Sequence, residues 1–364
     1  MSESLPVRNV ASANAGRRSR WWLKPILSVA TLALLLPVME IGVRLAVPRP
    51  PSWLPIYRHH PFLPIYTLQS NVHATVDTGD SRWTVHTDDE GFRVGRQPRV
   101  PDERPVLVWL GDSFTFGYGV DYESSFVGLL ALAKEGRYRH VNTAVGGYGP
   151  TQYRQTLEYL LGRNLRPRVV LIGAFLGNDF LDVIESKDLP VREGILGNEG
   201  GTKSILSQHF HLYRLATATM HRLHPYGVRQ HNLDLNTEVR AWTNGELREA
   251  DSIFRREFER MAALCQSHGV EMAVLIIPDG TMVDALARGA SRSPDGARDQ
   301  SLPLQHAVSA FRDLHIRYLD LTPTLVAHPV TETYYYFDGH FTPRGHALVR
   351  DAVVSEWRDL LLGP

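Results

Sequence analysis

Val106-Leu-Val-Trp-Leu-Gly-Asp-Ser-Phe-Thr-Phe-Gly-Tyr-Gly119 is the stretch of sequence that decides the fold. Its apolar run stops abruptly at Gly111-Asp-Ser113, and a glycine-rich turn follows. This pattern predicts a buried strand that delivers Ser113 to the carboxyl edge of a sheet. Reacting groups of open α/β sheets gather at that edge, so a serine there can act as a nucleophile if a base reaches it. Taken alone the tripeptide is a weak signal, because a serine at this point is also an ordinary helix N-cap.

Further apolar runs, bounded by turn residues and separated by helical patterns, follow along residues 104–364. With the first run they are Pro105–Leu110, Arg139–Ala144, Arg168–Phe175, Glu271–Ile277 and Ile316–Leu321. Five strands that alternate with helices predict an α/β fold, a three-layer αβα sandwich around a five-stranded parallel sheet. The hydrophobic share of 43% and the charged share of 21% are typical of a globular chain.

The N-terminus predicts a membrane anchor. A basic tail, residues 1–20, precedes an apolar segment at residues 21–47, which is long enough to span a bilayer. Glu40 and Arg44 interrupt this segment, but they lie four residues apart on one helical face and can form an ion pair. The positive-inside rule keeps the basic tail in the cytoplasm. The sequence therefore predicts a single-pass protein of a bacterial-type inner (plasma) membrane whose main domain is extracytoplasmic.

A cleavable signal peptide is the main alternative, because the purely apolar part of the segment is only as long as that of a signal peptide. We favour the uncleaved anchor, since no clean small-x-small cleavage site follows and Pro48-Arg-Pro-Pro51 is typical of a stiff linker. A cytosolic amphipathic helix is less consistent with a run that is apolar on all its faces.

Residues 48–103 predict a linker and a small β-hairpin extension. Asn71–Asp77 and Arg82–Thr87 alternate in polarity, and the glycine turn Thr78-Gly-Asp80 separates them. Asp88-Asp-Glu-Gly-Phe-Arg93 then leads into polar sequence that we interpret as the approach to the main domain. The sequence leaves open whether the hairpin packs on the main domain or borders a substrate.

One long insertion, residues 182–244, interrupts the main domain. It contains an apolar-periodic part, around Ile205–Leu223, and is well placed to shape a substrate cleft, although a lid and an inert excursion look alike in sequence. Residues Gly280–Ser301 are loop-like in composition. Cys265 lies in a predicted helix, Leu247–His268, and is most simply a buried small residue. A net charge of zero gives no indication of a nucleic-acid partner, and the sequence leaves protein partners unknown.

Two loops predicted at the same sheet edge carry hydrogen-bond donors. Val141-Asn-Thr-Ala-Val-Gly-Gly-Tyr-Gly149 follows the second strand, and the N–H of Gly147 could donate to an oxyanion. Gly177-Asn-Asp179 follows the third strand, where the Asn178 amide is a second donor of this kind. A plain turn and an Asx-turn or N-cap are the alternatives for these two loops.

Tyr334-Tyr-Tyr-Phe-Asp-Gly-His-Phe-Thr-Pro-Arg-Gly-His346 precedes a predicted C-terminal amphipathic helix. His340 could accept the serine proton, and Asp338 could orient its ring, because hydrolytic triads are assembled by the fold in several chain orders. His346 is an alternative base, although packing or capping is the simpler role for it. Asp338, His340 and His346 could also be metal ligands, but no compatible ligand set accompanies them from the third strand, so we predict no metal.

Together these segments resemble the SGNH (GDSL-type) hydrolase superfamily, whose four blocks supply Ser, Gly, Asn and His in that order. The matching residues are Ser113, Gly147, Asn178 and His340, and the resemblance extends from about Val106 to the C-terminus. It implies a flavodoxin-like fold, with an oxyanion hole formed by the N–H groups of Ser113 and Gly147 and by the Asn178 side chain. It also implies that Asp112 is structural and holds its loop by hydrogen bonds.

One departure from the superfamily concerns the partner of the histidine. The superfamily usually has Asp three residues before His, whereas Asp338 is two residues before His340. The run from His340 to Gly345 keeps the usual pattern and supports His340 as the base.

The resemblance implies a serine hydrolase or acyl transferase that cleaves an ester through a Ser113 acyl-enzyme and needs no cofactor. Its substrate is expected to be a small-molecule or carbohydrate ester, and an acylated cell-envelope carbohydrate is our most specific expectation. Alternatives are an O-acetyltransferase on a polysaccharide, a lipid esterase with an apolar cleft lined by residues 182–244, and a non-catalytic envelope binding module. A sugar site would present aromatic platforms, for which Trp242 and Tyr334–Tyr336 are candidates.

Overall fold

A computed structural model describes residues 23–47, 54–78, 80–97, 102–133, 136–163, 165–185, 189–192, 194–197, 206, 209–223, 243–292, 299–336 and 338–362. The chain divides into two units between Pro48 and Arg49. The described part of the first unit is a single helix, α1 (Leu23–Ala46). The second unit contains the other described elements.

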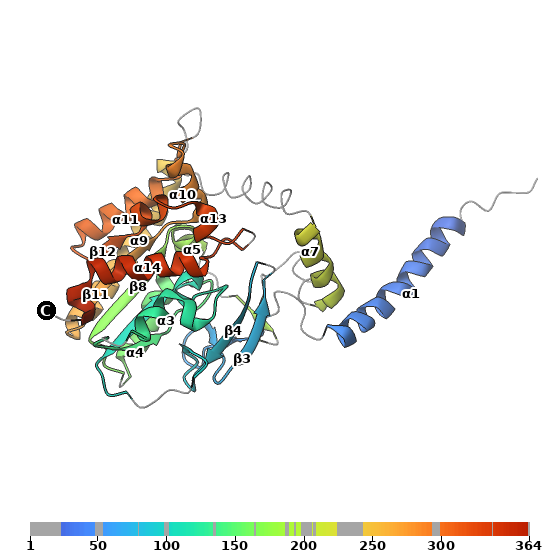
Figure 1. Ribbon diagram of the computed structural model, residues 1–364, viewed down its shortest axis with the longest axis horizontal. Helices are drawn as coiled ribbons and strands as arrows, with labels where there is room; N and C mark the ends of the chain where they lie inside the picture. Colours follow the sequence, from blue (N-terminus) through green and yellow to red (C-terminus); the bar gives the residue numbers. More distant parts are fainter. Residues whose placement is uncertain are drawn as a thin grey trace, which may run out of the picture. The chain divides into compact units, whose positions relative to one another are not determined.

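The second unit is built on one sheet (Figure 1). Its parallel strands are β6 (Val106–Gly111), β7 (Arg139–Asn142), β8 (Val169–Phe175), β11 (Glu271–Ile277) and β12 (Arg317–Asp320). They lie in the order β12-β11-β8-β6-β7. The chain adds β7 on one side of β6 and then β8 on the other side, so the strand order reverses at β6. Open α/β sheets bind ligands at such a reversal. The five parallel strands predicted from the sequence are confirmed.

The sheet is wider than predicted, because the N-terminal extension joins it. Strands β5 (Arg93–Val94), β4 (Arg82–Thr87) and β3 (His73–Asp77) continue beyond β7 in antiparallel order. The hairpin prediction is confirmed as β3 and β4, but the prediction of five strands was wrong, since the described residues form an eight-stranded sheet. An edge strand such as β7 has unpaired backbone groups, and pairing of Arg93 with Asn142 extends the sheet there.

Helices cover both faces of the parallel sheet, which confirms the three-layer arrangement. Successive side chains of a strand point to opposite faces, so Trp109 lies in one hydrophobic core and Val108 in the other. On the Trp109 side the helices are α3 (Phe126–Ala131), α12 (Thr322–Val326), α14 (Pro343–Glu356) and α15 (Arg358–Leu362). On the Val108 side they are α4 (Pro150–Leu161), α5 (Asp179–Glu185), α9 (Asn244–Ser267) and α11 (Leu302–Asp313).

Cys265 lies in α9 within the core on the Val108 side, as predicted. Burial raises the pKa of its thiol to about 12, so the group stays protonated and unreactive. The cysteine is therefore a small core residue.

The prediction of a loop at Gly280–Ser301 was wrong for its first part, which forms α10 (Gly280–Ala287). The Asp279 carboxylate caps this helix by accepting hydrogen bonds from the N–H groups of Thr281 and Met282. Met282, Val283 and Ala285 are buried, so tertiary packing stabilises a helix that begins with glycine. The Gly, Ser, Arg and Pro residues after Ala287 dominated the composition on which the loop prediction was based.

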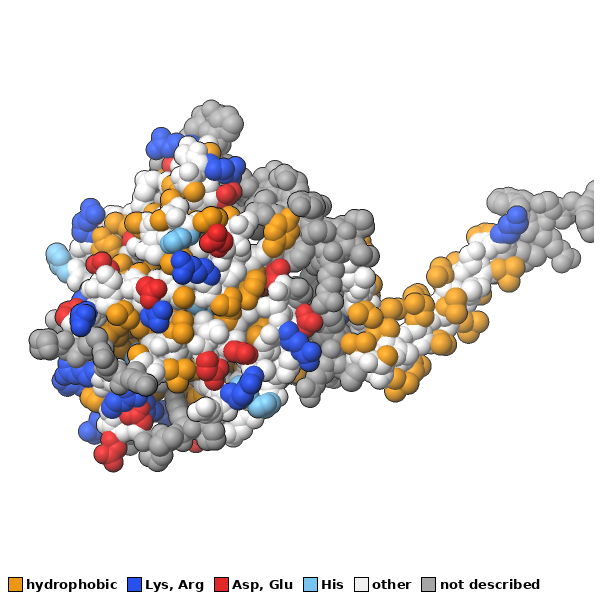
Figure 2. All heavy atoms as spheres, viewed as in Figure 1, with side chains coloured by type: hydrophobic (Ala, Val, Ile, Leu, Met, Phe, Trp, Pro, Cys, Tyr) orange, Lys and Arg blue, Asp and Glu red, His pale blue; other side chains and the backbone are white. Residues whose placement is uncertain are grey.

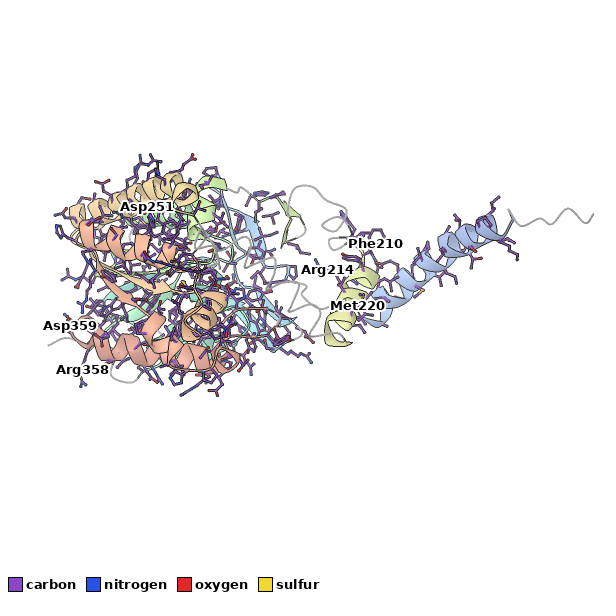
Figure 3. The ribbon with its side chains drawn as sticks, turned by 90° about the horizontal axis from the view of Figure 1, so that it is seen from above. Phe210, Arg214, Met220, Asp251, Arg358 and Asp359 are labelled. Atoms are coloured by element: carbon purple, nitrogen blue, oxygen red, sulfur yellow. The ribbon has the colours of Figure 1, made fainter. Side chains whose placement is uncertain are left out.

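The N-terminal extension also contains a short hairpin of β1 (Tyr57–His59) and β2 (Tyr66–Leu68). The insertion contributes a second one, β9 (Val191–Arg192) and β10 (Ile195–Leu196), and the backbone N–H of Tyr57 donates to the Gly194 carbonyl between them. Much of the apolar-periodic part of the insertion forms α7 (His211–Leu223), on which Arg214 and Met220 lie (Figure 3). Residues 224–242 of the insertion, Trp242 among them, lie outside the described residues.

Helix α1 has the length and composition of a membrane span. Its segment Lys24–Ala46 has a mean hydropathy of 2.2, and a signal sequence would meet the same criteria. Figure 2 shows hydrophobic side chains along the visible face of this helix. Arg44 Nε lies 2.7 Å from Glu40 Oε1, which confirms the predicted pairing of the two charges. The predicted basic tail, residues 1–20, lies outside the described residues.

Candidate active site

The first candidate residue, Ser113, lies directly beyond the carboxyl end of β6 and begins the short helix α2 (Ser113–Phe116). The N-cap of this helix is Asp112, whose carboxylate accepts a 2.9 Å hydrogen bond from the Phe114 N–H. The Ser113 hydroxyl is therefore not used for capping, in contrast to the alternative considered from the sequence. A side chain on Gly111 would collide with Thr115, which explains a glycine before the turn.

His340 reaches Ser113 from the other end of the chain. Its Nε2 lies 2.7 Å from Ser113 Oγ, which is hydrogen-bonding distance. The imidazole lies against the rings of Phe114 and Tyr118, with centroid separations of 4.8 and 4.7 Å. The Tyr335 N–H donates to the His340 carbonyl at 2.8 Å and closes the loop that carries the histidine. Ring packing and this loop hydrogen bond restrict where the imidazole can lie.

Asp338 is placed on the other side of the imidazole. Its Oδ2 lies 3.1 Å from His340 Nδ1, which is an ion-pair distance, although the alignment is not that of a hydrogen bond. The Asp338 backbone N–H donates to Asp80 Oδ2 at 2.8 Å. A spacing of two residues between Asp338 and His340 thus still allows the carboxylate to contact the ring.

His346 has a different environment from His340. It is buried at the start of α14, where its Nδ1 accepts a hydrogen bond from the Phe126 N–H at 3.2 Å. Burial lowers the pKa of His346 to about 3, so the ring is neutral at pH 7. These contacts are those of a packed core histidine that ties α14 to α3.

Two loops flank Ser113, because β6 lies between β7 and β8 in the sheet. Gly147, after β7, is exposed and has a φ of +81°, a conformation that favours glycine. Asn178, after β8, is half-buried, and its side-chain oxygen has no hydrogen-bond partner among the residues that the structure describes. Backbone N–H groups and a neutral amide at this edge can stabilise negative charge on an oxygen bound beside Ser113.

Buried carboxyls lie beneath these loops. Burial raises the pKa of Asp112 to about 6, and the Phe114 N–H and the nearby His340 oppose this in part. Burial and the neighbouring Asp112 raise the pKa of Asp179 well above its usual value. The Tyr153 hydroxyl lies 2.9 Å from Asp179 Oδ1. Both carboxyls therefore serve the loop structure, as the resemblance implied for Asp112.

The aromatic run Tyr334–Tyr336 is not an exposed platform. Tyr334 is buried, and its hydroxyl donates to the Pro278 carbonyl at 2.8 Å. The half-buried Tyr335 donates from its hydroxyl to the Gly119 carbonyl at 3.2 Å. The suggestion of a sugar platform was wrong for Tyr334, since Gly280 of α10 and the rings of Phe114 and Phe341 lie against that ring.

Helix α7 of the insertion carries a half-buried cation, Arg214 (Figure 3). Burial lowers the pKa of Arg214, and the Tyr118 hydroxyl opposes this in part. The sequence indicated that the insertion could shape the cleft, but it did not single out this residue.

Sequence reasoning also missed residues of the N-terminal extension. Arg93 is completely buried, and its guanidinium donates to the carbonyl oxygens of Gly117 and Val120 in the turn after Ser113. The Tyr66 hydroxyl donates to the Gly146 carbonyl at 3.1 Å. The alternation of Phe92, Arg93 and Val94 was the one signal of a strand, and the polar residues around it obscured that signal.

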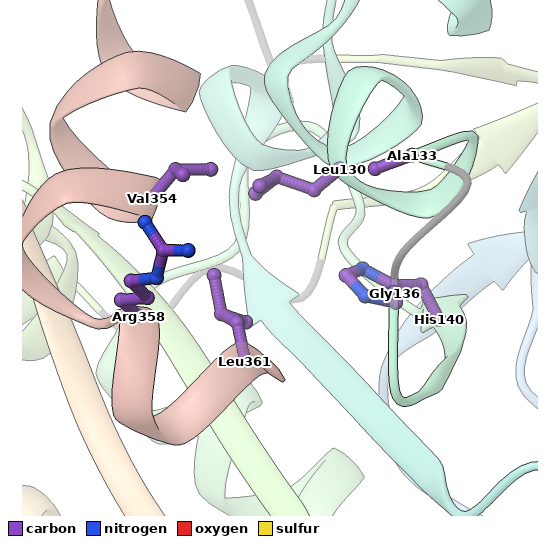
Figure 4. A pocket seen from close by; sticks show the side chains of 7 residues that line it. All are labelled: Leu130, Ala133, Gly136, His140, Val354, Arg358 and Leu361. Carbon is purple, nitrogen blue, oxygen red and sulfur yellow. The ribbon is translucent and has the colours of Figure 1, made fainter. Parts of the chain in front are cut away.

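A separate pocket of about 140 Å³ lies near the amino end of β7, at the opposite end of the sheet from Ser113. Leu130, Val354 and Leu361 line it, with His140 and Arg358 on opposite sides (Figure 4). His140 is not available as a base there, since burial lowers its pKa to about 3. Within the part of the chain that the structure describes, no cluster of three or more His, Cys, Asp and Glu residues could hold a metal.

The chain is similar to a family of known proteins and to several solved structures. The model of the GDSL-like lipase/acylhydrolase family matches residues 109–348. A lipolytic protein of the G-D-S-L family from Veillonella parvula is 11% identical, with a TM-score of 0.40, over 70% of this chain and 98% of its own. A lipase/acylhydrolase from Enterococcus faecalis is 16% identical, with a TM-score of 0.39, over 71% of this chain and 97% of its own. A comparison with curated proteins gives no match.

Proposed function

The chain belongs to the GDSL-like lipase/acylhydrolase family, and we propose that it cleaves an ester through an acyl-enzyme formed on Ser113. Membership of the family makes the protein a hydrolase that acts on ester bonds. The observation that carries the assignment of the nucleophile is the 2.7 Å contact between Ser113 Oγ and His340 Nε2. A hydroxyl paired with an imidazole in this way can lose its proton as it attacks a carbonyl carbon.

In the first half of the reaction, Ser113 Oγ bonds to the ester carbonyl carbon while its proton passes to His340 Nε2. The carbonyl oxygen becomes an oxyanion, which the N–H groups of Ser113 and Gly147 and the Asn178 amide stabilise. The bond to the leaving alcohol then breaks, and His340 returns the proton to that alcohol. Asp338 stabilises the imidazolium that exists between these two proton transfers.

In the second half, an acceptor hydroxyl attacks the Ser113 ester while His340 accepts its proton. The bond between the acyl carbon and Ser113 Oγ then breaks, and His340 returns the proton to Ser113 Oγ. Water as acceptor gives hydrolysis, whereas a sugar hydroxyl gives acyl transfer. Both outcomes use the same residues, so the acceptor depends on what occupies the site beside Ser113. Hydrolysis is the activity we assign, and O-acetyl transfer to a polysaccharide is the alternative.

We place an acylated cell-envelope carbohydrate first among the substrates. The half-buried Arg214 is a cation within the insertion, whereas a lipid esterase requires the insertion to line a wide apolar cleft. Helix α1, as an uncleaved anchor, would hold the domain at the outer face of the inner membrane, within reach of the cell envelope. A lipid ester and a non-catalytic binding module are the competing possibilities.

The test is covalent labelling of the full-length protein in detergent with a fluorophosphonate probe, followed by mapping of the modified peptide. We expect one phosphonylated residue, Ser113, together with turnover of p-nitrophenyl acetate. Turnover is then compared between acetylated oligosaccharides and long-chain p-nitrophenyl esters, with and without an added sugar acceptor. A folded protein that is neither labelled nor active would contradict the proposal and favour the binding module.

Asp338 supplies a second test of the mechanism. Asp338→Asn is expected to lower kcat for p-nitrophenyl acetate by about 10²- to 10³-fold, because the neutral amide no longer stabilises the imidazolium. We expect a loss at the lower end of what triad carboxylates show, since the contact with His340 is not an aligned hydrogen bond. The exposed Asp359→Asn (Figure 3) is the matched control. Equal activity of the two variants would exclude Asp338 from the mechanism.

A further inference from the structure

The N-terminal extension contacts the loop of every residue that we assign to catalysis except Asn178. The Tyr66 hydroxyl donates to the Gly146 carbonyl at 3.1 Å, beside Gly147. Asp80 Oδ2 accepts the Asp338 N–H at 2.8 Å. The Ser81 hydroxyl donates to the Gly119 carbonyl at 2.7 Å, in the turn after Ser113. These three contacts come from Tyr66, Asp80 and Ser81, which lie outside the segment matched by the family model.

We propose that the N-terminal extension is a working part of the active site through two of its side chains, of which Tyr66 positions the Gly147 N–H and Asp80 positions the Asp338 carboxylate. The proposal rests on the proposed function, because it takes Gly147 as an oxyanion donor and Asp338 as the partner of His340. It goes beyond that function in assigning catalytic consequences to side chains of the extension.

Tyr66 acts on the peptide bond that joins Gly146 to Gly147. The Gly146 carbonyl and the Gly147 N–H belong to one planar unit, so holding the oxygen on one side fixes the direction of the N–H on the other. Glycine on both sides of this unit gives the backbone little resistance to rotation, which increases the need for an external hydrogen bond. Tyr66 is 1% exposed and burial raises its pKa, so its hydroxyl remains a donor at all working pH values.

A second contact shows how closely the phenol fits this loop. A side chain on Gly147 would lie 2.7 Å from the Tyr66 hydroxyl, so the ring fills the space beside the glycine. The Tyr148 hydroxyl in turn donates to the Tyr66 carbonyl. Tyr66 therefore holds the oxyanion loop through its side chain and is itself held through its backbone.

Asp80 acts on the loop that carries Asp338 and His340. The Tyr335 N–H fixes one end of this loop by donating to the His340 carbonyl. The charge-assisted hydrogen bond from the Asp338 N–H to Asp80 fixes the residue between them, and thereby the origin of the side chain that faces His340 Nδ1. The contact between Asp338 Oδ2 and His340 Nδ1 is not an aligned hydrogen bond that would fix its own length. The distance between these two atoms therefore depends on where the loop backbone is held.

The experiment measures p-nitrophenyl acetate turnover, the rate of fluorophosphonate labelling and the thermal midpoint of the full-length protein and its variants. Tyr66→Phe removes one hydroxyl, and we expect kcat and the labelling rate to fall about 10- to 100-fold with little change in KM. Asp80→Ala is expected to lower kcat about tenfold, whereas Asp80→Asn, whose amide oxygen can still accept the Asp338 N–H, should retain activity within about threefold.

The matched controls are Asp89→Ala, an exposed aspartate of the same extension, and Tyr159→Phe on α4, and both should behave as wild type. Wild-type turnover in Tyr66→Phe and Asp80→Ala would overturn the inference while leaving the proposed function intact. If the thermal midpoint and the activity fall together and Asp80→Asn does not restore activity, the extension has only a structural role. That result would also overturn the inference. Absence of labelling and turnover in the wild type would refute the proposed function and the inference together.

Discussion

Turnover of p-nitrophenyl acetate is expected to fall about 10⁴- to 10⁶-fold when Ser113 is replaced with alanine, and fluorophosphonate labelling should disappear. The effect is this large because the acyl-enzyme cannot form without Ser113 Oγ, and His340 then has no hydroxyl at 2.7 Å from which to take a proton. The remaining activity would come from oxyanion stabilisation alone. KM should change little, since the missing hydroxyl contributes little to ground-state binding.

The measurement compares initial rates of Ser113→Ala, the wild type and Ser252→Ala, a control on the exposed face of α9. Ser113 is half-buried and is not the cap of α2, so alanine should leave the thermal midpoint unchanged. If Ser113→Ala keeps more than a few per cent of wild-type turnover while Ser252→Ala is normal, another nucleophile carries the reaction.

The parallel part of the fold and the pairing of Ser113 with His340 could be anticipated from sequence. The apolar runs of β6 and β8 are buried on both faces, and such strands read as continuous hydrophobic segments between turn residues. Because parallel strands end at one sheet edge, residues after different strands converge there whatever their separation in the chain. The pairing of His340 with Ser113 was expected because folds assemble hydrolytic triads in several chain orders.

The role of the N-terminal extension could not be anticipated in the same way. Its strands are short, and β5 has only two residues, so their periodicity is too brief to distinguish a sheet edge from a linker. The contacts of Tyr66 and Asp80 depend on tertiary placement of a hydroxyl against one carbonyl and a carboxylate against one N–H. No pattern of residue types encodes such a pairing.

Arg93 shows the same limit, since it lies in β5 and has no exposed surface. The sequence indicated no role for it beyond the segment that leads into the polar approach to the main domain. A charged residue after Asp88, Asp89 and Glu90 is normally solvated, and burial of an arginine requires carbonyl acceptors that only the folded turn after Ser113 provides.

Replacing Arg93 with methionine is expected to lower the free energy of unfolding by about 3–5 kcal/mol and to abolish most activity. The guanidinium donates to the carbonyls of Phe116, Gly117 and Val120, and each buried carbonyl left without a donor costs about 1–3 kcal/mol. It also lies 4.4 Å from the centre of the Phe116 ring, a cation–π contact that methionine loses. Burial lowers the pKa of Arg93 to about 9, so the group is still charged at pH 7.

Thermal and urea unfolding of Arg93→Met, Arg93→Lys and the exposed control Arg96→Ala would measure this contribution. Lysine keeps the charge but lacks the planar fork that reaches several carbonyls at once, so an intermediate loss is expected. The turn held by Arg93 begins at Ser113, and activity should therefore fall before the protein unfolds as temperature rises. An Arg93→Met protein as stable as Arg96→Ala would mean that water or rearranged backbone satisfies these carbonyls, and that the arginine does not hold the nucleophile turn.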